Sequence, residues 1–157
     1  ISIELIISDN PKAKGLKFGK IYKISNKIFN YKNKIIAEKK IISEIKNKKI
    51  KLICLAGFMR ILSKDFIEIF KGKILNIHPS LLPKYKGLNT HQRAISNREK
   101  YSGCTVHIVN SRLDSGKIIL QKKVKISKSD TAKSLAKKVL TQEHKLYPKA
   151  IRKVFSL

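Results

Sequence analysis

Short apolar runs that alternate with helix-like segments constrain the fold of this chain more than any other feature. Residues 52–56 are continuously apolar and end at Gly57, a pattern typical of a strand buried on both faces of a parallel sheet. Residues 3–8 and 74–78 are further strand-like runs, and residues 33–48 carry isoleucines near helical spacing. Strands that alternate with helices predict βαβ units, and therefore an α/β fold with a mostly parallel sheet.

The remaining runs predict a mixed edge and a closing helix. Residues 104–109 and 118–124 are predicted strands separated by the turn 110–116, and their pairing would add the mixed edge. Neither repeats nor a low-complexity linker interrupts the sequence, which predicts a single domain over residues 1–157. The other predicted elements are a weaker strand at 20–24, a short helix at 63–70 that Ser63 can cap, a helix around 90–97, and a helix that begins near Ser129 or Asp130 and runs towards Phe155.

The net charge of +26 suggests a nucleic-acid partner at first sight. The lysines, however, are spread along most of the chain, tryptophan is absent, and the sequence shows neither a recognition helix nor a stacking-aromatic motif. We therefore expect no specific nucleic-acid partner, and a basic nucleic-acid-binding module stays as an alternative. The same positive field would attract anions such as phosphates and polyglutamates.

Several features of the sequence bear on the compartment. The apolar runs are too short to cross a bilayer, and the first residues lack the basic leader and cleavage site of a signal peptide. Cys54 and Cys104 stand far apart without a CxxC or Cys/His cluster, so we expect two buried, reduced thiols and no structural zinc. These features predict a cytoplasmic protein without a membrane partner.

Asn76 and His78 are candidate functional residues at the end of the strand 74–78. A side-chain period of two places both on one face of that strand. They lie at the carboxyl end of a parallel-type strand, where open α/β sheets place their ligand crevice. The alternative is a core amide and a satisfied histidine, and the pattern alone supports both interpretations equally.

Asp114, in the turn 110–116, is the third candidate. A carboxylate in such a turn commonly caps backbone amides, and the turn alone favours that alternative. If Asp114 instead reaches His78, it would raise the pKa of the imidazole and favour its charged form. Asn76 could then donate to a formyl oxygen, protonated His78 could stabilise the oxyanion of a tetrahedral intermediate, and Asp114 could help to move the proton that leaves an attacking amine. Such acyl transfer requires no Ser or Cys nucleophile and no metal.

These residues lie within stretches that resemble the phosphoribosylglycinamide formyltransferase family, folate-dependent enzymes of purine biosynthesis. The matching stretches cover essentially the whole chain: residues 55–63, residues 75–85 with the motif Asn76-Ile77-His78-Pro79-Ser80, residues 103–121 and residues 142–148. The resemblance implies the formyltransferase fold, a Rossmann-like doubly wound sheet. It also implies transfer of the formyl group of 10-formyltetrahydrofolate to the amine of glycinamide ribonucleotide. Methionyl-tRNA formyltransferases and formyltetrahydrofolate hydrolases resemble the chain around Asn76, and they are the alternatives of the same fold.

The resemblance implies roles for individual residues, with Asn76, His78 and Asp114 as the catalytic ones. The folate would contact Lys34 near its glutamate tail, and its cleft would be lined by Met59, Arg60, Ile61, Leu62, Asn76, Asn110, Ser111, Arg112, Leu113 and Asp114. The substrate would be bound by Leu140, Thr141, Gln142 and Glu143, with Glu143 at the glycinamide amine. The residues alone would favour a solvated helix face for Glu143 and a surface cation for Arg60. Surface or structural positions, without a catalytic role, are expected for His91, Arg93, His107 and His144.

The front of the chain departs from the family pattern. Members usually open with a strand and a Gly-Ser-Asn loop that holds the ribose phosphate at a helix N-terminus, whereas residues 3–8 resemble the family's second strand. We therefore expect an N-terminally truncated formyltransferase domain that binds its substrate weakly in this form. Lys86 and Asn89 are smaller departures in the loop after Pro83. The implied partners are the two small-molecule substrates, bound by a monomer or homodimer.

Overall fold

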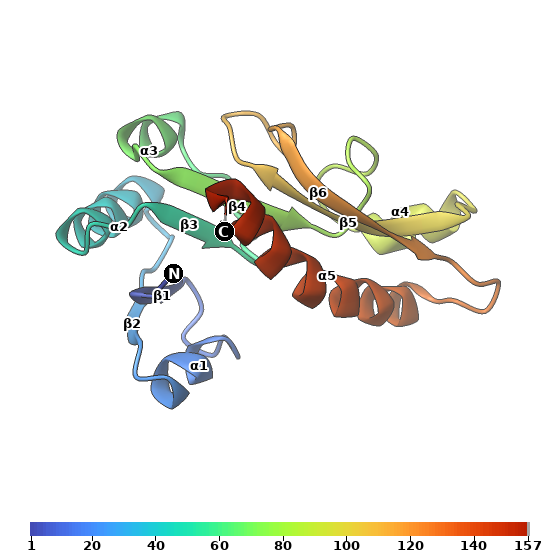
Figure 1. Cartoon of the computed structure of the whole chain (residues 1–157), viewed down its shortest axis with the longest axis horizontal. Coiled ribbons are helices and arrows are strands. Elements are labelled where there is room, and N and C mark those ends of the chain that lie inside the picture. Colours follow the sequence, from blue (N-terminus) through green and yellow to red (C-terminus); the bar gives the residue numbers. More distant parts are fainter. Residues whose placement is uncertain (157) are drawn as a thin grey trace. The chain divides into compact units, whose positions relative to one another are not determined.

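The computed structural model describes residues 1–156, which form six strands and five helices in two compact units (Figure 1). One unit contains residues 1–51 and 62–72, and the other contains residues 52–61 and the chain from residue 73 onward. Each unit has a sheet of its own. The α/β class with parallel pairing and a mixed edge is confirmed, whereas the single domain stays a prediction.

The unit that contains the chain from residue 73 onward is built on a four-stranded sheet. Its strands, in spatial order, are β3 (Leu52–Leu55), β4 (Lys73–His78), β5 (Tyr101–Ile108) and β6 (Ile118–Lys125). β3 and β4 pair in parallel, whereas β5 is antiparallel to both β4 and β6. The register of β4 with β5 places His107 opposite Asn76 and Thr105 opposite His78. This register decides which side chains meet in the candidate site.

One long helix, α5 (Ala132–Phe155), packs on β5 and β6 and closes the core of this unit (Figure 1). It begins after Thr131, which forms a capping box with Ser134. Its apolar face buries Leu135 and Val139 completely, in a cluster that also contains Leu75, Ile77, Cys104, Val106, Leu146 and Ala150. A shorter helix, α4 (Thr90–Ser96), contacts both β5 and α5. The sheet is therefore held against helices by ordinary apolar packing.

Tyr147 of α5 links the helix to the parallel part of the sheet. Its hydroxyl lies 2.9 Å from the carbonyl oxygen of Leu55 and 3.0 Å from that of Leu75. Burial raises the pKa of the Tyr147 hydroxyl well above its ordinary range, so it stays a protonated donor. The contact fixes α5 at the point where β3 and β4 lie side by side.

The other unit contains a parallel pair of strands and three helices. Its elements are β1 (Leu5–Ser8), α1 (Leu16–Ile21), β2 (Ser25–Ile28), α2 (Lys34–Asn47) and α3 (Lys64–Ile69). The Ser63 side chain caps α3 by accepting from Phe66, as predicted. The backbone N–H of Ser63 in turn donates to Glu38, a buried carboxylate on α2. This bond joins the start of α3 to α2.

Some predicted elements differ from the observed ones. The strand predicted at 20–24 is wrong: α1 extends to Ile21, and the strand begins only at Ser25. The Asn26 side chain donates to the Leu16 carbonyl and packs on Gly19, a tertiary contact that stabilises the helix and that local alternation does not reveal. The closing helix starts at Ala132, two residues or more after the predicted position, because Thr131 is the residue with the capping geometry.

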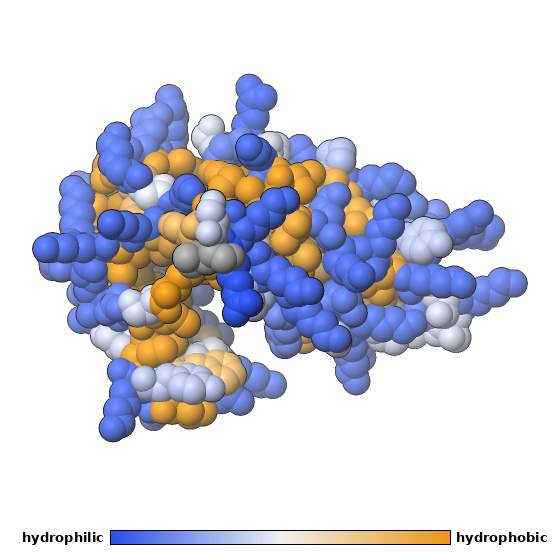
Figure 2. Space-filling model, viewed as in Figure 1, coloured by the Kyte–Doolittle hydropathy of each residue, from blue (hydrophilic) through white to orange (hydrophobic). Residues whose placement is uncertain are grey.

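The polar surface is spread over both units. Hydrophilic residues occupy much of the visible face of each unit in Figure 2 and do not form a single stripe. Among the helices of residues 1–156, none combines the length and apolar character needed to cross a membrane.

We predict that Leu135→Ala lowers the free energy of unfolding by about 2–5 kcal/mol, because it removes a fully buried side chain between α5 and the sheet. Leu140→Ala on the same helix is the matched control, since its side chain is 48% exposed. The control should change stability by no more than about 0.5 kcal/mol. Urea denaturation of both variants measures the difference, and equal losses would contradict the observed packing of α5.

Candidate active site

The candidate site is built on the polar face of β4 and β5. The pleat of β4 puts Asn76 and His78 on one face, and the antiparallel register adds His107 beside Asn76. His78 is 6% exposed and His107 is 2% exposed, so both imidazoles are almost shielded from water. Buried polar groups of this kind need hydrogen-bond partners within the protein.

Both ring nitrogens of His78 face acceptors. Nε2 lies 2.8 Å from the carbonyl oxygen of Tyr85, which can only accept, so Nε2 carries a hydrogen. Nδ1 lies 3.4 Å from Oδ2 of Asp114. The structure thus brings together His78 and Asp114, as the family resemblance implied although the turn alone favoured a backbone cap. It also adds a backbone carbonyl that the sequence did not predict. An imidazolium at His78 satisfies both acceptors.

Asp114 is placed by the connection between β5 and β6, which folds back over this polar face. Its φ of +44° lies in the left-handed region, which Asp tolerates better than most residues. Gly116 approaches the Ile108 carbonyl so closely that a Cβ would collide with it, and this approach returns the chain to the sheet. Oδ2 of Asp114 also accepts from the backbone N–H of Gly87, at 2.9 Å. The carboxylate therefore contacts both His78 and the loop after β4.

His107 orients the Asn76 amide. Its Nδ1 lies 3.0 Å from the carbonyl oxygen of Ile108 and donates to it, which leaves Nε2 as an acceptor for Nδ2 of Asn76 at 3.2 Å. Burial lowers the pKa of His107, which favours the neutral ring in this arrangement. Oδ1 of Asp114 lies 3.6 Å from the same Nε2. One amide hydrogen of Asn76 is thus used internally, and the other is left for a ligand.

The sequence did not assign His107 to this group. A surface position was one expectation for His107, and its burial contradicts that expectation. The side-chain period of β5 puts Thr105 and His107 on one face, but only the strand register shows that this face adjoins Asn76. His91 of α4 lies near His78 as well, and burial and the nearby His78 lower the pKa of His91.

The residues predicted to line a folate cleft fall in both units. Met59, Ile61 and Leu113 belong to the unit of the site and expose 75%, 59% and 50% of their surface. Arg60, Asn110, Ser111 and Arg112 are exposed in the same unit. Lys34 and Leu62 belong to the other unit, where Lys34 is exposed and Leu62 is buried.

The residues predicted to bind substrate lie in the middle of α5. Leu140 and Thr141 are exposed, whereas Gln142 and Glu143 are half-buried. Burial raises the pKa of Glu143. Burial, and to a smaller extent the nearby Glu143 carboxylate, raise the pKa of the Cys104 thiol of β5. Glu143 is therefore not fully solvated, and its role at the substrate stays a prediction. Residues 1–156 contain no group of three or more His, Cys, Asp or Glu side chains placed to hold a metal ion.

Comparison with known proteins gives consistent matches over this whole architecture. The formyl transferase family matches residues 1–151. Phosphoribosylglycinamide formyltransferase of Haemophilus influenzae is 42% identical over 153 residues, which cover 96% of this chain and 72% of the relative. The human trifunctional purine biosynthetic protein adenosine-3 is 40% identical over 157 residues, which cover 98% of this chain but only 16% of that relative. The crystal structure of phosphoribosylglycinamide formyltransferase from Bacillus halodurans superposes with a TM-score of 0.92 at 35% identity, covering 99% of this chain and 81% of the other.

The neutral, buried state of His107 generates a prediction about stability and pH. Because its pKa is lowered in the folded protein, the unfolded chain takes up the proton first as the pH falls below the ordinary histidine value of about 6.5. The folded state should therefore lose stability between about pH 7 and pH 5. His107→Gln keeps an acceptor for Asn76 but does not titrate, so its stability should fall less over the same range. Urea denaturation at both ends of the range tests this, and an equal fall in the two proteins would contradict it.

Proposed function

Because the chain belongs to the formyl transferase family, we propose that it transfers the formyl group of 10-formyltetrahydrofolate to the amine of glycinamide ribonucleotide, a step of purine biosynthesis. The observation that carries the proposal is the group of Asn76, His78 and Asp114, in which an amide and an imidazole are held on one face of the sheet with a carboxylate 3.4 Å from the imidazole. The similar proteins named as phosphoribosylglycinamide formyltransferases support the choice of substrate. They favour it over the transfer-RNA and hydrolase alternatives.

In this proposal each of the three residues has a distinct task. The attacking amine forms a bond to the formyl carbon, and the carbonyl electrons move onto the oxygen. Asn76 donates its unused amide hydrogen to that oxygen, while the positive charge of His78, two positions along the same strand face, stabilises the oxyanion. The Nδ1–Oδ2 distance of 3.4 Å is longer than an ordinary N–H···O bond, so His78 can share this hydrogen with the ligand.

Proton movement completes the transfer. The nitrogen of the amine becomes positively charged when it attacks, and Asp114 accepts its proton directly or through a water molecule. The electrons on the oxygen re-form the carbonyl, and the bond to the folate nitrogen breaks. That nitrogen takes up the proton that Asp114 accepted, directly or through water, which returns Asp114 to its ionised form. While it is ionised, before it accepts this proton, Asp114 would stabilise a positive charge on His78 through their contact.

The surfaces around the site suit the two proposed substrates. Met59, Ile61 and Leu113 would contact the flat pterin ring, since they offer exposed apolar surface in the unit that holds the site. Arg60 and the turn 110–114 would border this contact, and Lys34 and Leu62 of the other unit stay proposals for the folate. Glu143, with Leu140 to Gln142 beside it on α5, would bind the glycinamide amine. The net charge of +26 would attract the phosphate and the glutamate tail.

We predict that His78→Ala or Asp114→Asn lowers kcat/KM for formyl transfer by about a hundred- to a thousand-fold, the usual effect of removing an oxyanion stabiliser. The assay follows transfer from 10-formyltetrahydrofolate to glycinamide ribonucleotide by the protein as expressed from its own gene. Asp65→Asn is the matched control, because this carboxylate is exposed in the first turn of α3. Near-normal rates in either site variant would exclude the proposed roles, and no transfer by the unmodified protein would exclude the function.

A further inference from the structure

We propose that the side chains of Tyr85 and Glu99 anchor the loop after β4 and thereby position His78, without either side chain touching the reacting atoms. The kinetic part of this inference rests on the proposed function, whereas its structural part does not. In this assignment Tyr85 and Glu99 are positioning residues.

The loop reaches the site only through backbone groups. The carbonyl of Tyr85 accepts from Nε2 of His78 at 2.8 Å, and two residues later the N–H of Gly87 donates to Asp114 at 2.9 Å. Residues 85–87 therefore contact both members of the His78–Asp114 pair. Tyr85 has a φ of +55°, a left-handed conformation that a bulky aromatic residue adopts only when its surroundings impose it. Contacts made elsewhere must hold this conformation.

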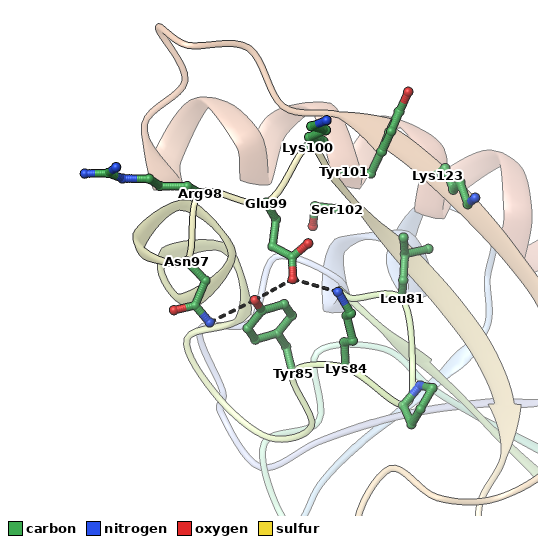
Figure 3. Close-up of a pocket in the computed structure, with 11 residues that line it drawn as sticks. Leu81, Lys84, Tyr85, Asn97, Arg98, Glu99, Lys100, Tyr101, Ser102 and Lys123 are labelled. Carbon is green, nitrogen blue, oxygen red and sulfur yellow. Dashed lines mark hydrogen bonds and ion pairs between the residues drawn. The ribbon is translucent and has the colours of Figure 1, made fainter.

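The side chain of Tyr85 supplies those contacts. Its hydroxyl donates to Oε1 of Glu99 at 2.9 Å and accepts from Nδ2 of Asn97 at 2.9 Å (Figure 3). Lys84 donates to the same Oε1 at 2.8 Å, so Glu99 joins two consecutive loop residues. Hydrogen bonds from Lys84 and Tyr85 lower the pKa of Glu99, which keeps the carboxylate charged as an acceptor.

Arg93 of α4 reinforces the same segment. Its guanidinium lies 5.2 Å from the centroid of the Tyr85 ring, within the range of a cation–π contact. It also donates to the carbonyl oxygens of Lys86 and Leu88, at 2.7 and 3.3 Å. These two carbonyls flank Gly87, whose N–H holds Asp114. Side chains of α4 and of the residues directly after α4 therefore both hold the loop in place.

The anchor has a specific consequence for the imidazole. As long as the Tyr85 carbonyl stays at Nε2, that nitrogen keeps its hydrogen, and Nδ1 is directed to Asp114. If the anchor is weakened, Nε2 loses its fixed acceptor, and the ring can exchange hydrogens or rotate. A role limited to stability would lower the free energy of unfolding and leave the ring nitrogens of His78 as they are. The protonation of the two ring nitrogens of His78 therefore distinguishes a positioning role from a role limited to stability.

The experiment compares Tyr85→Phe and Glu99→Gln, which remove one hydroxyl and one charge and leave side-chain size almost unchanged. Tyr101→Phe is the matched control, since Tyr101 lines the same cavity of about 590 Å³ and is 50% exposed. Nitrogen-15 NMR at one fixed pH reports the protonation of each ring nitrogen of His78. Asp114, His107 and His91, the titratable groups around His78, are the same in all variants.

We expect the His78 nitrogen signals to shift in both anchor variants and to stay at wild-type positions in Tyr101→Phe. Signals in both anchor variants that match the control would overturn the proposal. In the transfer assay we expect kcat to fall by about ten- to a hundred-fold, the usual effect of misplacing a catalytic group, while KM stays nearly constant. An unchanged kcat despite shifted signals would overturn the link to transfer. If the wild-type protein shows no transfer, the proposed function fails, and the NMR comparison still decides on the anchor.

Discussion

The need to satisfy a nearly buried imidazole organises the structure around the site. His78 is 6% exposed, so water cannot replace the acceptors at its two nitrogens, and an unpaired buried polar group costs about 1–3 kcal/mol. One acceptor comes from the loop directly after β4, and the other comes from the distant connection between β5 and β6. Both segments must return to the same strand end for the histidine to be satisfied. Their mutual bond, from Gly87 to Asp114, follows from that requirement.

The mixed edge of the sheet serves the same arrangement. Antiparallel β5, which follows β4 after a loop and α4, sets His107 against Asn76 in a fixed register. That contact uses one hydrogen of the Asn76 amide and leaves the other for a ligand. The turn that follows β5 then folds over the polar face and brings Asp114 within 3.6 Å of His107 and 3.4 Å of His78. Sheet topology and site chemistry are therefore linked.

Local patterns in the sequence predicted the parts of the site that one element determines by itself. The period of a strand put Asn76 and His78 on one face, and Ser63 was recognisable as a cap. Nothing local could reveal the contact of His107 with Asn76, because it depends on the register between two strands. The contacts of the Tyr85 carbonyl and the Gly87 N–H could not be predicted from the sequence either. Almost every residue has a backbone carbonyl and an N–H, and only the loop conformation directs these two towards the site. The approach of Asp114 to His78 was implied by family resemblance, and the turn itself favoured a simpler cap.

The chain carries a large positive charge, and several of its few acidic residues act as hydrogen-bond acceptors at defined points of the structure. Only 10 carboxylates accompany 36 lysine and arginine residues, so most cations have no acid to pair with. Four of the acids serve as acceptors at structural junctions: Glu38 holds the start of α3, Glu99 holds Tyr85, Asp114 holds His78, and Asp130 holds Ser127, Ser134 and Lys138 before α5. Three hydrogen bonds, the strongest from Lys138, lower the pKa of Asp130 to about 2. The surplus of 26 cations over acids produces a broad positive field that attracts anions, while orientation at the site depends on short-range contacts. In the proposed function, charge would govern the encounter with a phosphate-bearing substrate, and the acceptors around His78 would govern the reaction at the site.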